Sequence, residues 1–385
     1  MEKTLISFAT SADRSSTNAE KYTKRQRLFG SDEVIPLWVA DMDLDSPSFV
    51  LEAIRKRLDH PILGYEEMPR TALEAQAKWL KRHHEVDLDT KDLLYSPSVV
   101  ASINTAIEAF SSLGDAVVVQ TPVYAPFFKS VTSLDRVVIH NPLVQKDGIY
   151  KMNLEDLKAR CDEKTKLLLL CSPHNPVGRV WSEDELNDLV NFCRERHIII
   201  FSDEVHCDLS FAKHTSLLSL APDIAVCAYG VGKTFNLSGL AISTLAIKDA
   251  SLLERFLKVY NARHFGFGSL LSHTAFEVAY SKGDAWLELL LDHIKSNYDA
   301  LADLLRNSPI KLTPLEGTYL AWLDCRALKL SDRELRAFFT SAGLGLSAGT
   351  SFGREGSGFM RLNLAISKEA MSEVLARLKK ALCDG

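Results

Sequence analysis

The 385-residue sequence has few of the features that mark secreted, membrane-spanning or nucleic-acid-binding chains. Its seven cysteines are scattered, odd in number and without a Cys-x-x-Cys pair, which predicts free thiols in a reducing compartment, the cytoplasm. No apolar run approaches about 18 residues, so we expect no transmembrane helix. The N-terminus lacks the apolar core of a signal peptide. With a net charge of −5 and no basic block, we expect neither a nucleic-acid nor a membrane partner.

The sequence does contain ample apolar material and an alternation of strand-like and helix-like segments. It is 46% hydrophobic, which supports a sizeable core, and its length suggests about two domains. The apolar runs typical of buried strands are 116–120, 137–139, 166–171, 197–202 and 224–228. Amphipathic helices are predicted between them. This alternation predicts an α/β domain with a mainly parallel sheet.

Local signals refine these boundaries. Pro122 suits the first turn of a helix, so we expect a helix to start at Thr121-Pro122. Ser182 and Glu185 form the pattern of a capping box. The Gly/Ser-rich stretch 347–358 predicts a mobile loop.

The pattern changes towards the C-terminus. Strands are predicted at 317–323 and 359–364, and helices at 331–342 and 367–382, which indicates a smaller α+β unit. We therefore predict a large α/β domain over 46–290. Residues 1–45 and 291–385 are predicted to form the small domain together.

Polar residues follow three of the predicted strands. They are Asn175, Asp203 and Lys233, and ligands of parallel sheets bind beyond the carboxyl ends of the strands. A desolvated lysine amine loses its proton more easily and becomes a nucleophile. Each residue also has a structural interpretation: Lys233 as a surface lysine, Asp203 as an ion-pair partner, and Asn175 as a turn residue before Pro176.

This set fits a Schiff-base cofactor with a protonatable ring nitrogen. Such a cofactor needs an amine, a carboxylate at the ring nitrogen, a donor to its phenolic oxygen and a ring to stack on. Lys233, Asp203, Asn175 and Tyr124 can supply these groups, although Tyr124 could also be a core aromatic residue. The helix that starts after Ser98 offers backbone N–H groups to a phosphate.

Arg361 lies at the centre of an apolar strand. Its guanidinium could bind a substrate carboxylate in bidentate fashion, or it could form a structural ion pair.

The sequence resembles the fold-type I pyridoxal-phosphate enzymes of the class I/II aminotransferase superfamily. The matching motifs occur in the family's order across nearly the whole chain: Ser172-Pro173-His174-Asn175-Pro176-Val177-Gly178, Ser202-Asp203-Glu204-Val205-His206, Gly232-Lys233-Thr234-Phe235-Asn236 and Met360-Arg361-Leu362-Asn363. A narrower resemblance is to the cystathionine β-lyase-like (C–S lyase) branch. It rests on residues 35–43, 173–181, 203–209 and 233–237.

The resemblance implies the cofactor pyridoxal 5'-phosphate and a role for each matching residue. Lys233 would bond the cofactor aldehyde, Asp203 would face the ring nitrogen, and Asn175 would donate to the phenolic oxygen. Tyr124 would stack on the ring. Val99-Val100 would offer backbone donors to the phosphate.

The sequence departs from the family pattern around the phosphate. Gly230 and Gly232 stand where the family usually has hydroxyl residues, and Ala241 stands where many relatives have an arginine. We therefore expect the phosphate to depend on backbone groups, Thr234 and Tyr65, and the cofactor to be held more loosely.

By the same resemblance, Arg361 and Asn175 would bind an amino-acid substrate. Tyr65 would reach the partner's site across a homodimer interface and touch the substrate there. Either protonated Lys233 or Tyr65 would help the thiolate to leave. The implied reaction is α,β-elimination on cystathionine or another cysteine S-conjugate, giving thiol, pyruvate and ammonia. The same residues also suit an aminotransferase acting with a 2-oxo acid, which stays the alternative.

Two other interpretations have less support. A regulatory or binding protein that has lost the chemistry is disfavoured by the intact set of site residues. No metal site is expected, because His206 and Cys207 would point apart on a strand and His83-His84 suits a solvated helix end.

Overall fold

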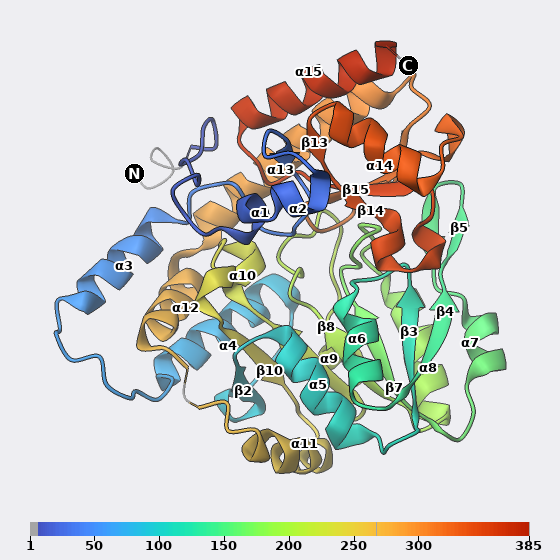
Figure 1. The fold of residues 1–385 in the computed structure, drawn as a ribbon. Coiled ribbons are helices and arrows are strands. Elements are labelled where there is room, and N and C mark those ends of the chain that lie inside the picture. The colour runs from blue at the N-terminus through green and yellow to red at the C-terminus, as the bar shows by residue number, and fades with distance from the viewer. Residues whose placement is uncertain (1–6, 267, 385) are drawn as a thin grey trace.

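The centre of the molecule is a seven-stranded sheet with helices on both sides (Figure 1). The computed structural model describes residues 7–266 and 268–384. In spatial order the strands are β2 (Leu93–Ser96), β10 (Ser243–Ala246), β9 (Ala225–Tyr229), β8 (Ile199–Asp203), β7 (Thr165–Cys171), β3 (Ala116–Thr121) and β4 (Val137–Pro142). The pairs from β4 to β9 are parallel, and β10 is antiparallel to both neighbours. The predicted mainly parallel sheet is confirmed.

Alternate residues of the central strands pack on opposite faces of this sheet, as the two-residue period of a strand requires. Val117 and Val119 of β3 belong to one apolar cluster, and Val118 belongs to the other. Helices that cover the Val117 face are α5 (Val99–Phe110), α6 (Pro126–Ser133) and α11 (Ala250–Ala262). Helices that cover the Val118 face are α4 (Arg70–His84), α8 (Glu183–Glu195) and α12 (Leu270–Lys282). The strands are therefore buried on both sides, which explains their continuous apolar runs.

A second sheet is formed by the C-terminal part of the chain. Its order is β11 (Lys311–Leu312), β12 (Leu320–Asp324), β15 (Phe359–Asn363) and β14 (Ser347–Ala348). Nearby, β1 (Ile35–Pro36) pairs in parallel with β13 (Leu344–Gly345). The blue helices α1 (Glu20–Thr23) and α2 (Arg25–Phe29) accordingly lie beside the orange α14 (Asp332–Ser341) in Figure 1. The predicted small domain combines residues 1–45 with 291–385, and the β1–β13 pairing brings these two parts together. The exact domain limits stay a prediction.

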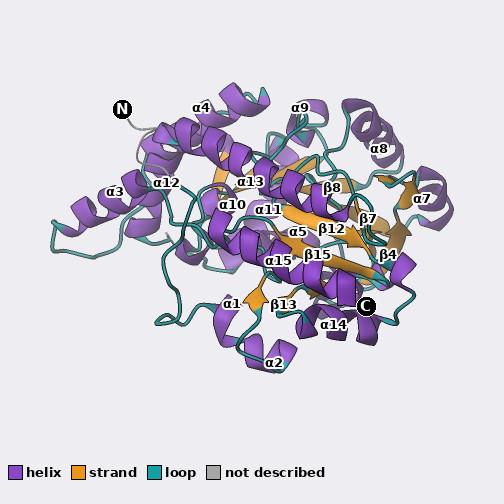
Figure 2. Cartoon of the chain, turned by 90° about the horizontal axis from the view of Figure 1, so that it is seen from above, coloured by secondary structure: helices purple, strands orange, loops and turns teal. Residues whose placement is uncertain are grey.

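The remaining elements complete the layers. Seen from above, α13 (Asp284–Leu305) and α15 (Lys368–Asp384) lie over β12 and β15 (Figure 2). The shorter elements are α3 (Ser48–Leu58), β5 (Val144–Lys146), β6 (Ile149–Lys151), α7 (Leu154–Arg160), α9 (Leu217–Leu220) and α10 (Val231–Thr234). Within the described residues, no helix is both long and apolar enough to cross a membrane.

Two local predictions were wrong. The helix expected at Thr121-Pro122 begins instead at Pro126, because Thr121 still pairs with β4 and the Val123 amide donates to Phe352 O at 2.8 Å. The stretch 347–358 is not a plain loop: it contains β14 and two 3₁₀ turns. There the backbones of Gly349 and Gly356 approach so closely that a Cβ on Gly349 would lie 2.0 Å from Gly356 O. The glycines allow this close approach and are not a sign of a loose chain.

Candidate active site

A cavity of about 710 Å³ lies at the carboxyl ends of the large sheet, where the second sheet covers them. Seven of the predicted site residues line it: Asn175, Asp203, Lys233, Tyr124, Val99, Val100 and Arg361. The first three come from the ends of adjacent parallel strands, in register at Cys171, Asp203 and Ala228. The structure therefore brings together residues that are far apart in sequence, for the reason the strand pattern predicts.

Asp203 ends β8 and is 6% exposed. Its Oδ1 accepts the Val205 amide at 3.2 Å. Burial raises the pKa of Asp203 to about 6, against the opposing effects of the Val205 amide and the Lys233 amine. A carboxylate in this environment is stabilised by any cationic or N–H partner that enters the cavity.

Lys233 lies on α10, a single helical turn after β9. Burial lowers the pKa of its amine; Arg361 acts in the same direction, and the Asp41 and Asp203 carboxylates oppose it. The amine donates to Ala40 O at 2.6 Å. A lowered pKa increases the neutral fraction of a lysine amine, and the neutral amine is the nucleophilic and basic form.

The N-terminal stretch 38–41 contacts the site through its backbone carbonyls. Ala40 O accepts the Lys233 amine, and Trp38 O accepts Arg361 Nη2 at 2.5 Å. The carbonyls of residues 39 and 41 both accept the Asn363 side-chain amide, at 2.9 and 2.8 Å. One short segment therefore joins the lysine, the arginine and the strand that carries the arginine.

Arg361 extends from β15 into the cavity and is 5% exposed. Its Nη1 donates to Asn175 Oδ1 at 2.9 Å, and its guanidinium lies 4.7 Å from the centre of the Phe352 ring. Burial lowers the pKa of Arg361 to about 10, so it stays cationic at neutral pH. Its Nε has no hydrogen-bond partner in the described structure, which leaves donor capacity for a bound carboxylate.

The start of α5 forms one wall of the cavity. Ser98 is its N-cap and accepts the Ala101 amide at 3.1 Å, so the first N–H groups of the helix, at Val99 and Val100, stay available. Such a helix start favours an anion. Tyr124, partly buried, stands at the same cavity.

The two unexpected glycines have a packing reason. A Cβ on Gly230 would lie 3.3 Å from Ser243 Cβ, and one on Gly232 would lie 3.1 Å from Ser238 Oγ. Ser238 itself lines the cavity, and its hydroxyl donates to Gly232 O at 3.1 Å. A hydroxyl is therefore present at this wall, but it comes from Ser238, which lies after the lysine in the sequence and not before it.

Two predicted residues lie outside the cavity wall. Thr234 is fully buried and donates to Asp208 Oδ2 at 2.8 Å, because its place on α10 turns its side chain away from that of Lys233. The structure does not bring Thr234 to the expected phosphate position. Tyr65 is 99% exposed on the loop between α3 and α4.

Sequence reasoning missed His206 as a residue of the wall. It is 4% exposed, lines the cavity three residues after Asp203, and its Nδ1 has no hydrogen-bond partner in the described structure. Burial lowers the pKa of His206 well below its usual value, and Lys233 and Arg361 add to this, so the ring is neutral. The available signal in the sequence was that His206 lies three residues after Asp203, close to the carboxyl end of the same strand.

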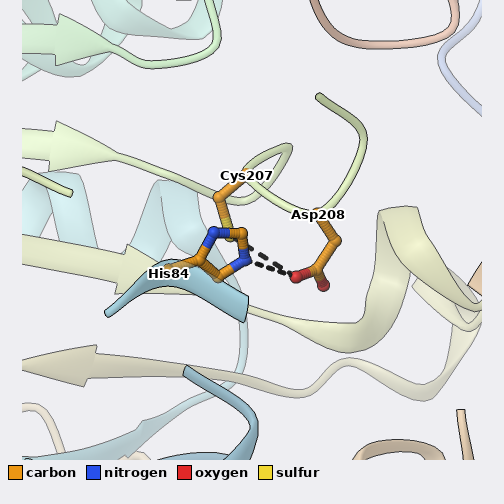
Figure 3. Close-up of side chains that lie close together, drawn as sticks. All are labelled: His84, Cys207 and Asp208. Carbon is orange, nitrogen blue, oxygen red and sulfur yellow. Dashed lines mark hydrogen bonds and ion pairs between the residues drawn. The ribbon is translucent and has the colours of Figure 1, made fainter. Parts of the chain in front are cut away.

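The expectation for His84 was wrong. It ends α4 but is 8% exposed, and its Nε2 lies 2.7 Å from Asp208 Oδ1 (Figure 3). The neighbouring His83 does lie near the surface, where its Nε2 is 2.7 Å from Asp284 Oδ1. A helix end can be covered by a later segment, here the turn that carries Asp208, and this is invisible in the local sequence.

Comparison with known proteins gives matches over nearly the whole chain. The family model "Aminotransferase class I and II" matches residues 32–378. Cystathionine beta-lyase PatB of Bacillus subtilis is 38% identical, with 98% of this chain and 100% of that protein covered.

Comparison with solved structures also gives matches over nearly the whole chain. Cystalysin from Treponema denticola, which contains a pyridoxal 5'-phosphate cofactor, is 34% identical with a TM-score of 0.95 and covers 99% of both chains. The PLP-bound C–S lyase from Staphylococcus hominis is 32% identical with a TM-score of 0.89 and covers 97% of both chains.

Proposed function

Because the chain belongs to the aminotransferase class I and II family, we propose that it is a pyridoxal 5'-phosphate-dependent carbon–sulfur β-lyase. The predicted family and fold-type I architecture are confirmed. The enzyme eliminates the sulfur substituent of cystathionine or a related cysteine conjugate and releases a thiol, pyruvate and ammonia. The observation that carries this proposal is that a cavity with a lysine, aspartate, asparagine and arginine lies in a chain similar over its full length to cystathionine β-lyases and C–S lyases.

The cavity fits the cofactor by the chemistry of its donors. Lys233 offers an amine of lowered pKa, Asp203 a buried carboxylate for the ring nitrogen, and Asn175 an amide for the phenolic oxygen. Tyr124 offers a ring, and the start of α5 offers N–H groups for the phosphate. When bound, the cofactor supplies an electron-withdrawing ring that spreads the charge left by removal of the substrate's α-proton.

The chain's own groups bind the substrate and move its protons. Arg361 holds the α-carboxylate through its free donors, and Asn175 helps to orient it. Lys233 Nζ takes the α-proton as general base. The carbon–sulfur bond then breaks with its electron pair on sulfur, and Lys233 Nζ returns a proton to the leaving thiolate. The released enamine is hydrolysed to pyruvate and ammonia.

A single assay separates this reaction from transamination, which would use the same residues. Purified enzyme is incubated with L-cystathionine, and pyruvate and thiol are measured with and without 2-oxoglutarate. We expect equal pyruvate release in both. Product formation only in the presence of the 2-oxo acid would overturn the lyase.

The working unit is a homodimer in which Tyr65 enters the partner's site. The support is the exposure of apolar side chains around it: Ile62 at 66%, Leu63 at 61% and Tyr65 at 99%. Subunit mixing tests this. Lys233→Ala and Tyr65→Ala variants, each weakly active, should regain about one quarter of wild-type activity when mixed, because half of the random dimers carry one intact site. Activity that does not rise on mixing would contradict the shared site.

A reducing compartment, the cytoplasm, is the proposed location. All seven cysteines are free thiols, and six of them are buried. Fractionation of cells that express the tagged protein tests this.

A further inference from the structure

A buried polar cluster lies directly beneath the helix that carries Lys233. Its centre is the Asp208 carboxylate, which is 6% exposed. Asp208 Oδ1 accepts His84 Nε2 at 2.7 Å and Trp79 Nε1 at 2.9 Å, and Oδ2 accepts Thr234 Oγ1 at 2.8 Å. Figure 3 shows the His84 ring pointing at the carboxylate, with the Cys207 thiol on the same side.

The geometry of this cluster is that of hydrogen bonds. Ligand atoms of His84, Cys207 and Asp208 lie within 4.8 Å of one another, which raises the question of a metal ion. Two ligands at about 2.0 Å from a tetrahedral zinc lie about 3.3 Å apart. The 2.7 Å between His84 Nε2 and Asp208 Oδ1 is shorter, and both carboxylate oxygens already have donors. Asp208 therefore acts as a hydrogen-bond acceptor.

The donors come from segments that also form the active site. Thr234 directly follows Lys233 on α10, which has only four residues and depends on contacts outside itself to hold its shape. Asp208 lies in the turn that follows β8, five residues after Asp203. The Asp208–Thr234 hydrogen bond therefore joins the segment of the amine to the segment of the carboxylate.

A further hydrogen bond fixes the backbone of Thr234. Trp286 Nε1 on α13 donates to Thr234 O at 2.9 Å, so both the side chain and the backbone of Thr234 are fixed. Trp79 and His84 in turn attach Asp208 to α4. The helix that carries Lys233 is thus fixed by the hydrogen bonds of Thr234 with Asp208 and Trp286, on the side away from the cavity.

We propose that Asp208 is a positioning residue: its bond to Thr234 fixes the separation of the Lys233 amine and the Asp203 carboxylate. The inference rests on the proposed function, since it concerns the two groups that hold the cofactor there. The reacting amine must stay close to its target, and a displacement of about 1 Å can cost about a hundredfold in rate. The amine and carboxylate also interact electrostatically, so a change in their separation changes the titration of the bound cofactor.

The test uses Thr234→Val and Thr234→Ser in the holoenzyme. Valine keeps the shape and removes the donor, whereas serine keeps the donor. With Thr234→Val we expect kcat to fall by about ten- to a hundredfold. We also expect the midpoint pH of the cofactor's visible absorbance change to move by about half a unit or more. Thr234→Ser should restore both to within about twofold in rate and about 0.2 pH units.

Asp208→Asn provides the second arm, with Asp223→Asn as its control. Asp223 is a surface aspartate that pairs with Arg194, with Oδ2 2.9 Å from Arg194 Nε. Asp208→Asn should shift the absorbance midpoint as Thr234→Val does, and Asp223→Asn should leave it unchanged. Thermal unfolding identifies any variant that does not fold. If one of Thr234→Val and Asp208→Asn does not fold, the proposal is tested with the other.

Two results would overturn the proposal. One is a folded Thr234→Val enzyme whose absorbance midpoint and kcat equal those of the wild type. The other is one equivalent of tightly held zinc per chain in the purified enzyme that disappears in Cys207→Ser, since Asp208 would then be a ligand. The absorbance readout needs no turnover, so a wild type that binds the cofactor without β-elimination would refute the proposed function and still test the positioning.

Discussion

Asp203 and Asp208 lie five residues apart and are both 6% exposed, yet the pKa of one is raised and that of the other is lowered. Burial acts on both carboxylates in the same direction. Asp203 faces the cavity with one backbone N–H donor, and its pKa rises to about 6. Burial would likewise raise the pKa of Asp208, but the donors His84, Trp79 and Thr234 outweigh it.

The difference separates two kinds of buried polar group. On the cavity side, Asp203 has one backbone donor and a raised pKa, and Arg361 Nε has no hydrogen-bond partner in the described structure. Those beneath the cavity, such as Asp208 and Thr234, have their partners within the chain. At this site, the unmet donor of Arg361 is available to a ligand, and the fully partnered Asp208 and Thr234 hold neighbouring groups in place.

The largest effect is expected from Lys233→Ala, which removes the amine on the cavity side. Both nucleophile and general base are lost, so kcat should fall by about 10⁴-fold or more, and the visible absorbance of the bound cofactor should be lost. Steady-state kinetics and an absorbance spectrum measure this. Lys213→Ala, at an exposed ion pair with Glu85, is the matched control. Retained turnover would remove Lys233 from the mechanism.

Arg361→Lys should have the next largest effect. Lysine keeps the charge but not the planar pair of donors, so kcat/KM for cystathionine should fall by about a hundredfold. Most of the loss should be in KM, because the carboxylate is bound before and during reaction alike. Arg354→Lys, at an exposed arginine, should change little. A loss confined to kcat would argue against carboxylate binding.

The two aspartates predict opposite stability changes in the cofactor-free protein. The folded pKa of Asp203 is raised, so its ionisation opposes folding above that pKa, and the cost vanishes below about pH 4, where both states are protonated. Asp203→Asn should therefore raise the free energy of unfolding at pH 8 by on the order of 1–3 kcal/mol.

The folded pKa of Asp208 is lowered, so its ionised form stabilises the fold above the usual aspartate pKa, and this is lost as the pH falls through the folded value. Asp208→Asn should lower the free energy of unfolding at pH 8 by about 1.5–3 kcal/mol. Urea unfolding of both variants at pH 8 and pH 4 tests the pair. Changes of the same sign would break the comparison between the two carboxylates.

Gly232→Ser should have the smallest effect. Gly232 lines the cavity and lies on α10 between the cavity and the Asp208 cluster. Its Cβ would press on Ser238 Oγ, so the free energy of unfolding should fall by about 1 kcal/mol. Gly239→Ser, where a Cβ meets nothing within 4 Å, is the control. Tighter cofactor binding by Gly232→Ser without loss of stability would instead show that a hydroxyl is missing there.

The sequence predicts the residues that line the cavity far better than the buried residues that hold them in place. Asn175, Asp203 and Lys233 follow apolar runs, and parallel strands bring such ends to one edge, so their convergence follows from local pattern alone. Asp208 and His84 give no such signal, because their contact joins segments 124 residues apart. The antiparallel β10 was missed because it is a short strand, which depends on its two neighbours. The roles of the site residues and the dimer stay predictions.

The stretch 38–41 has a consequence for how the enzyme tolerates change. Ala40 O accepts the Lys233 amine and Val39 O accepts the Asn363 side-chain amide, and both residues also line the cavity. Substitutions at these two positions keep the carbonyls in place, so in a saturation library we expect activity to fall only with side chains too large for the cavity wall. A one-residue deletion would move every carbonyl out of register at once and should abolish activity. Alignment gaps should consequently be rare here, and a designer can vary the amino acids of this stretch within the space of the cavity wall but cannot change its length.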